Sequence, residues 1–501
     1  MSCEGICSEQ VAGHRLMLRS RSVAALFALV PLALACGGEP TAVKPPNVLF
    51  IAVDDLNDWT SQLGGHPQAK TPNIDALAAR GVSFSNAHAA APTCGPSRAA
   101  IMTSIRPSTS GNYENADTFT DNPVLNNAVI LPELFQQAGY QVVGAGKLFH
   151  GHHHKSELKG RGFDTYFPSK ENDHYKEPKD RARPKPVSDW GQGAKGFWDW
   201  GPMASYITLD DMSDGRMVNW VRDQFQSGEI KEPFFVAAGI IRPHLPFYAP
   251  QSYFDMYPLD EIQLPAVKED DLADVPLAGR NMGVGEARHE AITSHGQWAT
   301  AIQAYLAATT FADDCVGRLL EGLENSGYAD NTIVVLWSDH GWQFGEKKHW
   351  SKFTLWERAT RVNLVFAGPG VATGADSNAP VNLLDVYPTL AQLTGLTAPK
   401  EQIEGRSLAP LLEDPSRDWP WPSITTYGSG NHTARDERWR YIRYHDGSEE
   451  LYDHESDPME WTNLASAAQH VDVKQRLASA LPRENAEQIQ GRTKPVVRAL
   501  D

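Results

Sequence analysis

The chain has 501 residues, of which 41% are hydrophobic and 9% aromatic, which is enough apolar material for one large and one smaller folded part. Its 45 basic and 62 acidic residues give a formal charge of −17. Because there is no basic excess to neutralise phosphates, the chain is not expected to bind nucleic acid. The overall field repels anions, so an anionic substrate would need a local cluster of Lys, Arg and His.

The N-terminus carries a targeting signal. Two arginines precede an apolar run, residues 23–35, that is too short to span a bilayer. We therefore predict that residues 1–36 are a signal peptide and that the protein is exported to the periplasm or cell surface. The end of the run resembles a bacterial lipoprotein signal, with a lipid on Cys36 as the only expected membrane contact. Simple cleavage after Ala35 is the alternative.

Cleavage after Ala35 would leave few cysteines: Cys36, Cys94 and Cys315. This number is too small for a disulfide framework. Cys315 lies in a helical pattern, where a small buried apolar residue is the expected role.

Strand and helix patterns alternate along most of the chain. After a linker at residues 37–46, continuous β-branched and aromatic runs are typical of strands buried on both faces. Such alternation predicts an α/β fold with a large, mostly parallel sheet flanked by helices. The predicted strands cover residues 47–53, 140–143, 234–240 and 332–337, and the predicted helices cover residues 73–80, 131–138 and 305–323.

The pattern changes beyond about residue 399. Residues 438–444 and 450–453 alternate charged and aromatic side chains, which is typical of strands with one solvent-exposed face. We therefore predict a catalytic domain over residues 47–399 and a smaller antiparallel-sheet subdomain over residues 400–501.

Charged and metal-binding side chains follow four of the predicted strands, and ligands of open α/β sheets bind at such strand ends. Asp54, Asp55 and Asp339 supply hard oxygen ligands suited to Ca²⁺ or Mg²⁺, with His340 as a candidate fourth ligand. An exposed loop is the alternative for the two adjacent aspartates. The pattern predicts metal-assisted transfer of an anionic group and leaves phosphate and sulfate both open. The groups available to neutralise the anion and protonate its leaving oxygen are Lys147, His150, His244 and Lys352.

Residues 92–98, Pro-Thr-Cys-Gly-Pro-Ser-Arg, resemble the type I sulfatase signature Cys-x-Pro-Ser-Arg. The cysteine of that signature is oxidised to formylglycine by the formylglycine-generating enzyme. The resemblance covers nearly the whole mature chain and implies an alkaline-phosphatase-like fold. Further matching motifs lie at residues 71–75, 146–150, 338–341 and 450–453, and residues 242–247 and 345–352 are most similar to iduronate-2-sulfatase and its bacterial relatives.

This resemblance implies a mechanism and a role for each matching residue. The hydrated aldehyde formed from Cys94 would attack sulfur and then release sulfate by carbon–oxygen cleavage, a route that a serine ester lacks. The implied catalytic residues are Cys94, Arg98, Lys147, His150, His244 and Lys352. The implied Ca²⁺ ligands are Asp54, Asp55, modified Cys94, Asp339 and His340, of which the histidine is the least secure because nitrogen is a soft ligand for calcium.

The predicted function is therefore hydrolysis of a sulfate ester on a sulfated carbohydrate. One alternative is a phosphatase or phosphodiesterase of the same superfamily, and another is a lipid-anchored glycan-binding protein whose Cys94 is never converted. His349 and Trp350 could either touch substrate or support their loop. The tract His152–His154 is expected in an exposed loop rather than in a second metal site.

Overall fold

The computed structural model describes residues 44–117, 119–150, 161–167, 177–180 and 198–489. Its centre is an eight-stranded mixed sheet in the order β13-β2-β12-β9-β1-β7-β4-β5. All neighbours are parallel except that β12 runs antiparallel to both β9 and β2. The strands are β1 (Asn47–Val53), β2 (Gly81–Phe84), β4 (Gln141–Gly146), β5 (Thr165–Phe167), β7 (Phe234–Ile240), β9 (Thr332–Ser338), β12 (Leu364–Ala367) and β13 (Ala375–Ser377).

The central strand β1 explains why its sequence is apolar throughout. It pairs with β7 on one side and β9 on the other, and all seven of its residues are buried. Leu49 and Ile51 face one hydrophobic core, whereas Val48 and Phe50 face a second. A strand covered on both faces has no solvent-exposed side, so its sequence does not alternate between polar and apolar residues.

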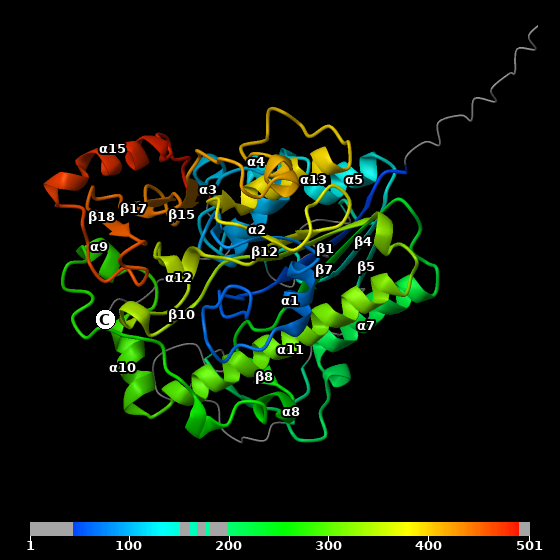
Figure 1. Cartoon of the computed structure of the whole chain (residues 1–501), viewed down its shortest axis with the longest axis horizontal. Helices are drawn as coiled ribbons and strands as arrows, with labels where there is room; N and C mark the ends of the chain where they lie inside the picture. The colour runs from blue at the N-terminus through cyan, green and yellow to red at the C-terminus, as the bar shows by residue number, and fades with distance from the viewer. Residues whose placement is uncertain (1–43, 118, 151–160, 168–176, 181–197, 490–501) are drawn as a thin grey trace, which may run out of the picture. The chain divides into compact units, whose positions relative to one another are not determined.

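Helices cover both faces of this sheet (Figure 1). The helix predicted from residue 305 begins earlier, because the Ala-rich segment before it continues the same buried stripe, including Ala301 and Ala304. Cys315 is buried in this helix, as predicted. The helices are α1 (Pro72–Ala78), α7 (Ser213–Gln226) and α11 (Trp298–Glu324) on one face, and α2 (Cys94–Thr103), α5 (Leu131–Gln137) and α13 (Val386–Leu393) on the other.

A second, four-stranded antiparallel sheet follows in the C-terminal part, with strands paired in chain order. Helix α15 (Val471–Ala480) packs on it through Leu477 (Figure 1). The boundary near residue 399 stays a prediction. The four strands are β15 (Ser423–Thr426), β16 (His432–Arg435), β17 (Trp439–Arg443) and β18 (Glu449–Asp453).

Short elements surround the main sheet, and one ribbon, formed by β10 and β11, holds a loop of the site described below. These elements are β3 (Ala87–His88), α3 (Pro107–Ser110), α4 (Pro123–Asn127), β6 (Trp200–Pro202), β8 (Phe247–Ala249), α8 (Gln251–Phe254), α9 (Leu277–Arg280), α10 (Glu286–Ser294), β10 (Gln343–Phe344), β11 (Trp350–Ser351), α12 (Glu357–Thr360), β14 (Val381–Asn382) and α14 (Ala409–Glu413).

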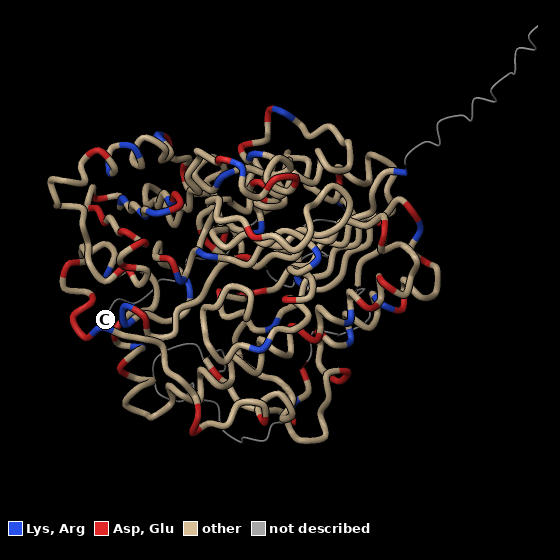
Figure 2. Tube along the Cα trace, viewed as in Figure 1, with Lys and Arg blue, Asp and Glu red and all other residues tan. Residues whose placement is uncertain are grey.

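Acidic and basic residues are interspersed along the described chain (Figure 2). None of the helices in the described ranges combines the length and the apolar character needed to cross a bilayer. The predicted signal peptide and Cys36 lie outside the described residues.

Candidate active site

The predicted site residues meet at the carboxyl edge of the central strands. Asp54 and Asp55 follow β1, and Asp339 and His340 follow β9, its parallel neighbour. Lys147 follows β4, two strands away on the other side of β1. Parallel strands end at the same edge, so residues far apart in sequence are brought together here, as the alternating pattern predicted.

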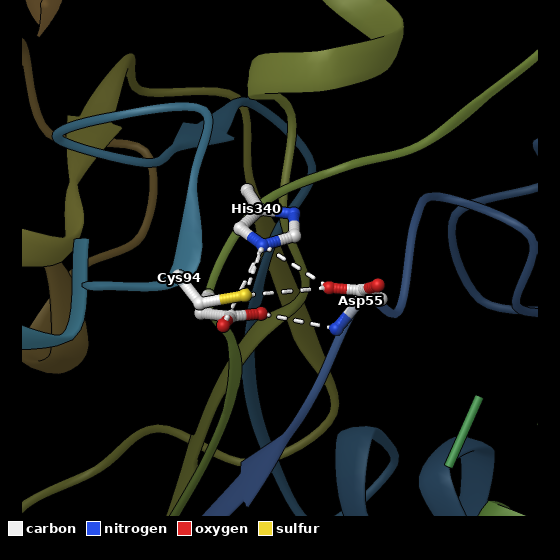
Figure 3. A group of neighbouring side chains, drawn as sticks. Asp55, Cys94 and His340 are labelled. Atoms are coloured by element: carbon white, nitrogen blue, oxygen red, sulfur yellow. Dashed lines mark hydrogen bonds and ion pairs between the residues drawn. The ribbon is translucent and has the colours of Figure 1, made fainter. Parts of the chain in front are cut away.

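Cys94 is the first residue of α2 and is fully buried. Its Sγ atom lies 3.3 Å from His340 Nε2 and 3.7 Å from Asp55 Oδ1 (Figure 3). The Nζ atoms of Lys352 and Lys147 lie 2.9 Å and 3.9 Å from the same sulfur. The side chain at position 94 is therefore turned toward the carboxylate cluster and lies within 4 Å of two cations.

Arg98, one turn further along α2, ties the strand ends together. Its Nη2 donates to Asp54 Oδ1 over 2.9 Å and its Nε donates to Asp339 Oδ2 over 2.8 Å. A third donor, Nη1, reaches the Lys147 carbonyl at 2.6 Å. All three side chains of the two ion pairs are fully buried, so each charge depends on its partner. A further contact of Arg98 with modified Cys94 stays a prediction.

Burial and neighbouring charges perturb the carboxylates in opposite directions. Burial alone raises the pKa of Asp54, but Lys147 and Arg98 together hold that pKa below its usual range. Burial raises the pKa of Asp339 to about 6, against the opposing effect of Arg98. Burial lowers the pKa of His340, and the Asp339 carboxylate more than offsets this, giving about 9. The charges of this buried cluster are therefore set by one another as much as by burial.

The Cys94 thiol lies in a strongly cationic environment. Burial raises its pKa, but the charges of Lys147, Lys352 and His340 outweigh burial and hold the pKa well below the ordinary value for a thiol. A hydrogen bond with His150 lowers the pKa further. The same cations would stabilise any anion formed or bound at this position.

The donor set fits a hard divalent cation. Ligand atoms of Asp55, Cys94, Asp339 and His340 all lie within 4.8 Å of one another. Asp55 Oδ2 is buried and accepts no hydrogen bond, which leaves an oxygen lone pair for a cation. The two carboxylates of this group, Asp55 and Asp339, match the oxygen preference of Ca²⁺. A second, overlapping group within the same distance consists of Asp54, Asp55 and His244.

The remaining predicted catalytic groups also border Cys94. His150 has a buried Nδ1 atom without a hydrogen-bond partner, in addition to its contact with Cys94. His244 Nε2 lies 3.7 Å from Asp55 Oδ2, and its side chain is 16% exposed, so it stands on the more open side. Lys352 Nζ donates to Asp55 Oδ1 over 2.7 Å. The tract His152–His154 lies outside the described residues.

Sequence patterns missed several residues that position these groups. Asn115 Oδ1 accepts the Gly95 N–H at 2.8 Å at the head of α2. Buried Asp214 accepts the N–H groups of Ile241 and Arg242 at 2.8 and 2.9 Å, which fixes the chain just before His244. No local spacing signals such contacts, because each joins segments that are distant in sequence.

His349 and Trp350 support their loop, because both side chains are fully buried. His349 bonds from Nδ1 to the Lys347 carbonyl at 2.5 Å and from Nε2 to the Arg280 carbonyl at 3.1 Å. Of the two alternatives left by the sequence, the structure favours the supporting role.

A family model described as Sulfatase matches residues 46–396, well over half of the chain. The chain belongs to the sulfatase family. A second model, described as N-sulphoglucosamine sulphohydrolase, C-terminal, matches residues 345–487 of this sulfatase.

Individual proteins similar to this chain are consistent with its assignment to the sulfatase family. The chain is 43% identical over 458 residues to a sulfatase of Formosa agariphila, covering 89% of this chain and 88% of that protein. It is 28% identical over 407 residues to iduronate 2-sulfatase of Homo sapiens, covering 70% of each. The solved structure of phosphonate monoester hydrolase of Agrobacterium radiobacter matches with a TM-score of 0.69 at 23% identity, covering 87% of this chain and 94% of that one.

These findings confirm the predicted alkaline-phosphatase-like fold and the predicted class of enzyme. The likeness to the phosphonate hydrolase shows the fold alone. As a member of the sulfatase family, the chain is a sulfuric ester hydrolase. The alternative of a glycan-binding protein without catalysis is thereby disfavoured.

Proposed function

We propose that this sulfatase removes sulfate from a sulfated carbohydrate, with formylglycine made from Cys94 as nucleophile and Ca²⁺ as metal. The observation that carries the proposal is the position of Cys94. It lies fully buried at the head of α2, inside the Cys-x-Pro-Ser-Arg signature, and its Sγ is within 4 Å of a carboxylate, a histidine and two lysines. A nucleophile held there would face a sulfate group whose charge the lysines neutralise.

The metal would be held by the two overlapping groups described above. When bound, Ca²⁺ supplies Lewis-acid polarisation of a sulfate oxygen. The chain's own contribution includes keeping the Asp54 carboxylate ionised and oriented, which Arg98 and Lys147 do through their ion pairs with it. The proposed ligands are Asp54, Asp55, modified Cys94, Asp339 and His340.

Formylglycine, when present, supplies a hydrate hydroxyl as nucleophile and allows the aldehyde to be regenerated. The surrounding side chains would bind the sulfate group and move protons. Lys147 and Lys352 would clamp sulfate oxygens, and the burial of Lys352 would limit competition from water there. His150, which contacts Cys94, would accept a proton from the group at position 94. His244, on the more open side, would donate a proton to the departing alcohol.

The proposed substrate is a sulfated glycan. More specifically, we propose that the sulfate is removed from a 2-O-sulfated uronate. Support comes from the iduronate 2-sulfatase of Homo sapiens at 28% identity and from the matching motifs at residues 242–247 and 345–352. Export to the periplasm or cell surface follows from the signal at residues 1–36, with a lipid anchor on Cys36. A formylglycine-generating enzyme is then a required partner.

Two measurements on one preparation test this function. Mass spectrometry of the tryptic peptide that contains Cys94 should show the mass loss expected when a thiol becomes an aldehyde. A panel of sulfated glycans, assayed by released sulfate, should show turnover that Cys94→Ala abolishes and the matched variant Cys315→Ala retains. An intact thiol in an active preparation, or full turnover by Cys94→Ala, would refute the nucleophile. Faster turnover of a phosphate ester than of every sulfate ester would favour the phosphatase alternative.

A further inference from the structure

The loop that carries Lys352 has an unusual backbone. Four of its non-glycine residues have positive φ: Lys347 at 49°, Lys348 at 52°, Ser351 at 73° and Phe353 at 78°. Residues with a Cβ atom rarely adopt this region, and each one that does adds backbone strain. A segment with this backbone keeps its conformation only if surrounding contacts hold it.

This backbone decides where the Lys352 ammonium lies. Lys352 stands between Ser351 and Phe353, both left-handed, and its Nζ lies 2.7 Å from Asp55 Oδ1. Relaxation of either neighbour would rotate the chain at Lys352 and withdraw its side chain from Cys94. The position of the Lys352 ammonium therefore depends on the contacts that keep this loop in its conformation.

Lys347 anchors the loop from a buried position. Its Nζ donates to Asp271 Oδ1 over 2.8 Å and to the Glu460 carbonyl. The same ammonium lies 5.0 Å from the centre of the Tyr452 ring and 5.5 Å from that of Trp356. Lys347 is only 2% exposed, so an unpaired charge there would be costly. Tyr452 and Glu460 belong to the C-terminal part of the chain, which thus closes around this lysine.

Further contacts hold the loop between this anchor and Lys352. The Lys347 carbonyl accepts a hydrogen bond from His349, and the next residue, Trp350, donates its N–H to the Val284 carbonyl at 2.8 Å. The neighbouring Lys348 differs, because its ammonium pairs with Glu269, which is 94% exposed. Two adjacent lysines with the same kind of backbone thus differ in burial and in partner.

We propose that Lys347 is a positioning residue for catalysis: its ion pair with Asp271 and its bond to the C-terminal part hold the strained loop so that Lys352 reaches the sulfate site. This inference rests on the proposed function, in which Lys352 clamps a sulfate oxygen. It also assigns a task to the C-terminal part, whose Glu460 carbonyl and Tyr452 ring complete the anchor.

The test compares Lys347→Met and Asp271→Asn with the matched control Lys348→Met, all in the full chain. We expect the first two to lower kcat by roughly 10- to 100-fold, as displacements of about 1 Å do, while KM changes by less than about 3-fold. Lys348→Met should keep the wild-type kcat. Lys347→Arg, which retains a cation, should recover most of the loss. If Lys347→Met does not fold, the less disruptive Asp271→Asn decides.

Double variants separate positioning from general destabilisation. In a Lys352→Ala background, Lys347→Met should lower kcat by less than about 2-fold, because residues that act through one another are not additive. Equal losses in both backgrounds, or a wild-type kcat for Lys347→Met and Asp271→Asn, would overturn the inference alone. Wild-type turnover by Lys352→Ala would instead overturn the role proposed for Lys352, and the inference with it.

Discussion

The Nζ atom of Lys352 lies 2.9 Å from the Sγ atom of Cys94, although 258 positions separate the two residues in sequence. Lys352 belongs to the loop after β11, and Cys94 begins α2. The cation and the proposed nucleophile therefore come from separate elements, and the site exists only once both have packed against the strand ends.

Loss of the cation at position 147 should slow turnover. Lys147 pairs with Asp54 and lies 3.9 Å from Cys94 Sγ. We expect Lys147→Met to lower kcat by roughly 10²- to 10³-fold, the effect of removing one electrostatic stabiliser in other hydrolases. Steady-state kinetics on a sulfate ester would measure the loss, with Lys70→Met, which removes an exposed lysine, as the control. A kcat within a few-fold of wild type would contradict the role.

Loss of the Arg98 guanidinium should destabilise the fold. Arg98→Met leaves the buried carboxylates of Asp54 and Asp339 without their partner, and breaking a buried pair in this way costs about 3–5 kcal/mol. The control Arg438→Met removes a half-exposed cation paired with Asp453 and should cost less than about 1 kcal/mol. Denaturant unfolding measures both. Equal losses would mean that burial of the Arg98 pairs is unimportant.

Calcium should stabilise the folded protein. A ligand that binds only the native state adds about 2.7 kcal/mol at a hundred times its Kd, so Tm should rise with free Ca²⁺ and fall when a chelator is added. Thermal unfolding of converted protein with Ca²⁺, Mg²⁺ or chelator measures this without reference to activity. Asp55→Asn, which weakens the ligand set, should reduce the shift. A Tm that does not change with the Ca²⁺ concentration would contradict the proposed metal.

His432 should make the protein less stable in acid. Burial and the charge of Arg443 lower the pKa of His432 to about 4 from its ordinary 6.5. The folded state thus keeps this ring neutral while the unfolded chain takes up a proton below about pH 6.5. Stability should therefore fall as the pH drops from about 6.5 to about 4, by up to roughly 3 kcal/mol from this residue.

The variant His432→Gln tests this dependence, with the exposed His445→Gln as control. Urea unfolding at pH 7 and pH 4.5 should show a smaller drop for His432→Gln than for wild type, whereas His445→Gln should follow wild type. Parallel curves for all three proteins would show that His432 does not titrate as described.

The sequence predicted the layers of the fold well. The runs at residues 47–53 and 234–240 are the strands β1 and β7 with unchanged bounds. Such strands are buried on both faces, and this environment imposes a continuous apolar composition that can be read locally. Boundaries that depend on packing were less accurate: β4 runs to Gly146 rather than ending at Val143.

The sequence by itself determined the class of fold, the Cys-x-Pro-Ser-Arg signature and the polar residues at the strand ends, because each is a local pattern. Only the tertiary structure decided which groups hold the site in place. The anchor of Lys347 joins Asp271 to Glu460, and Asp214 fixes the chain before His244. Hydrogen bonds and ion pairs depend on distances in space, and no regular spacing along the chain encodes contacts between segments that meet only after folding.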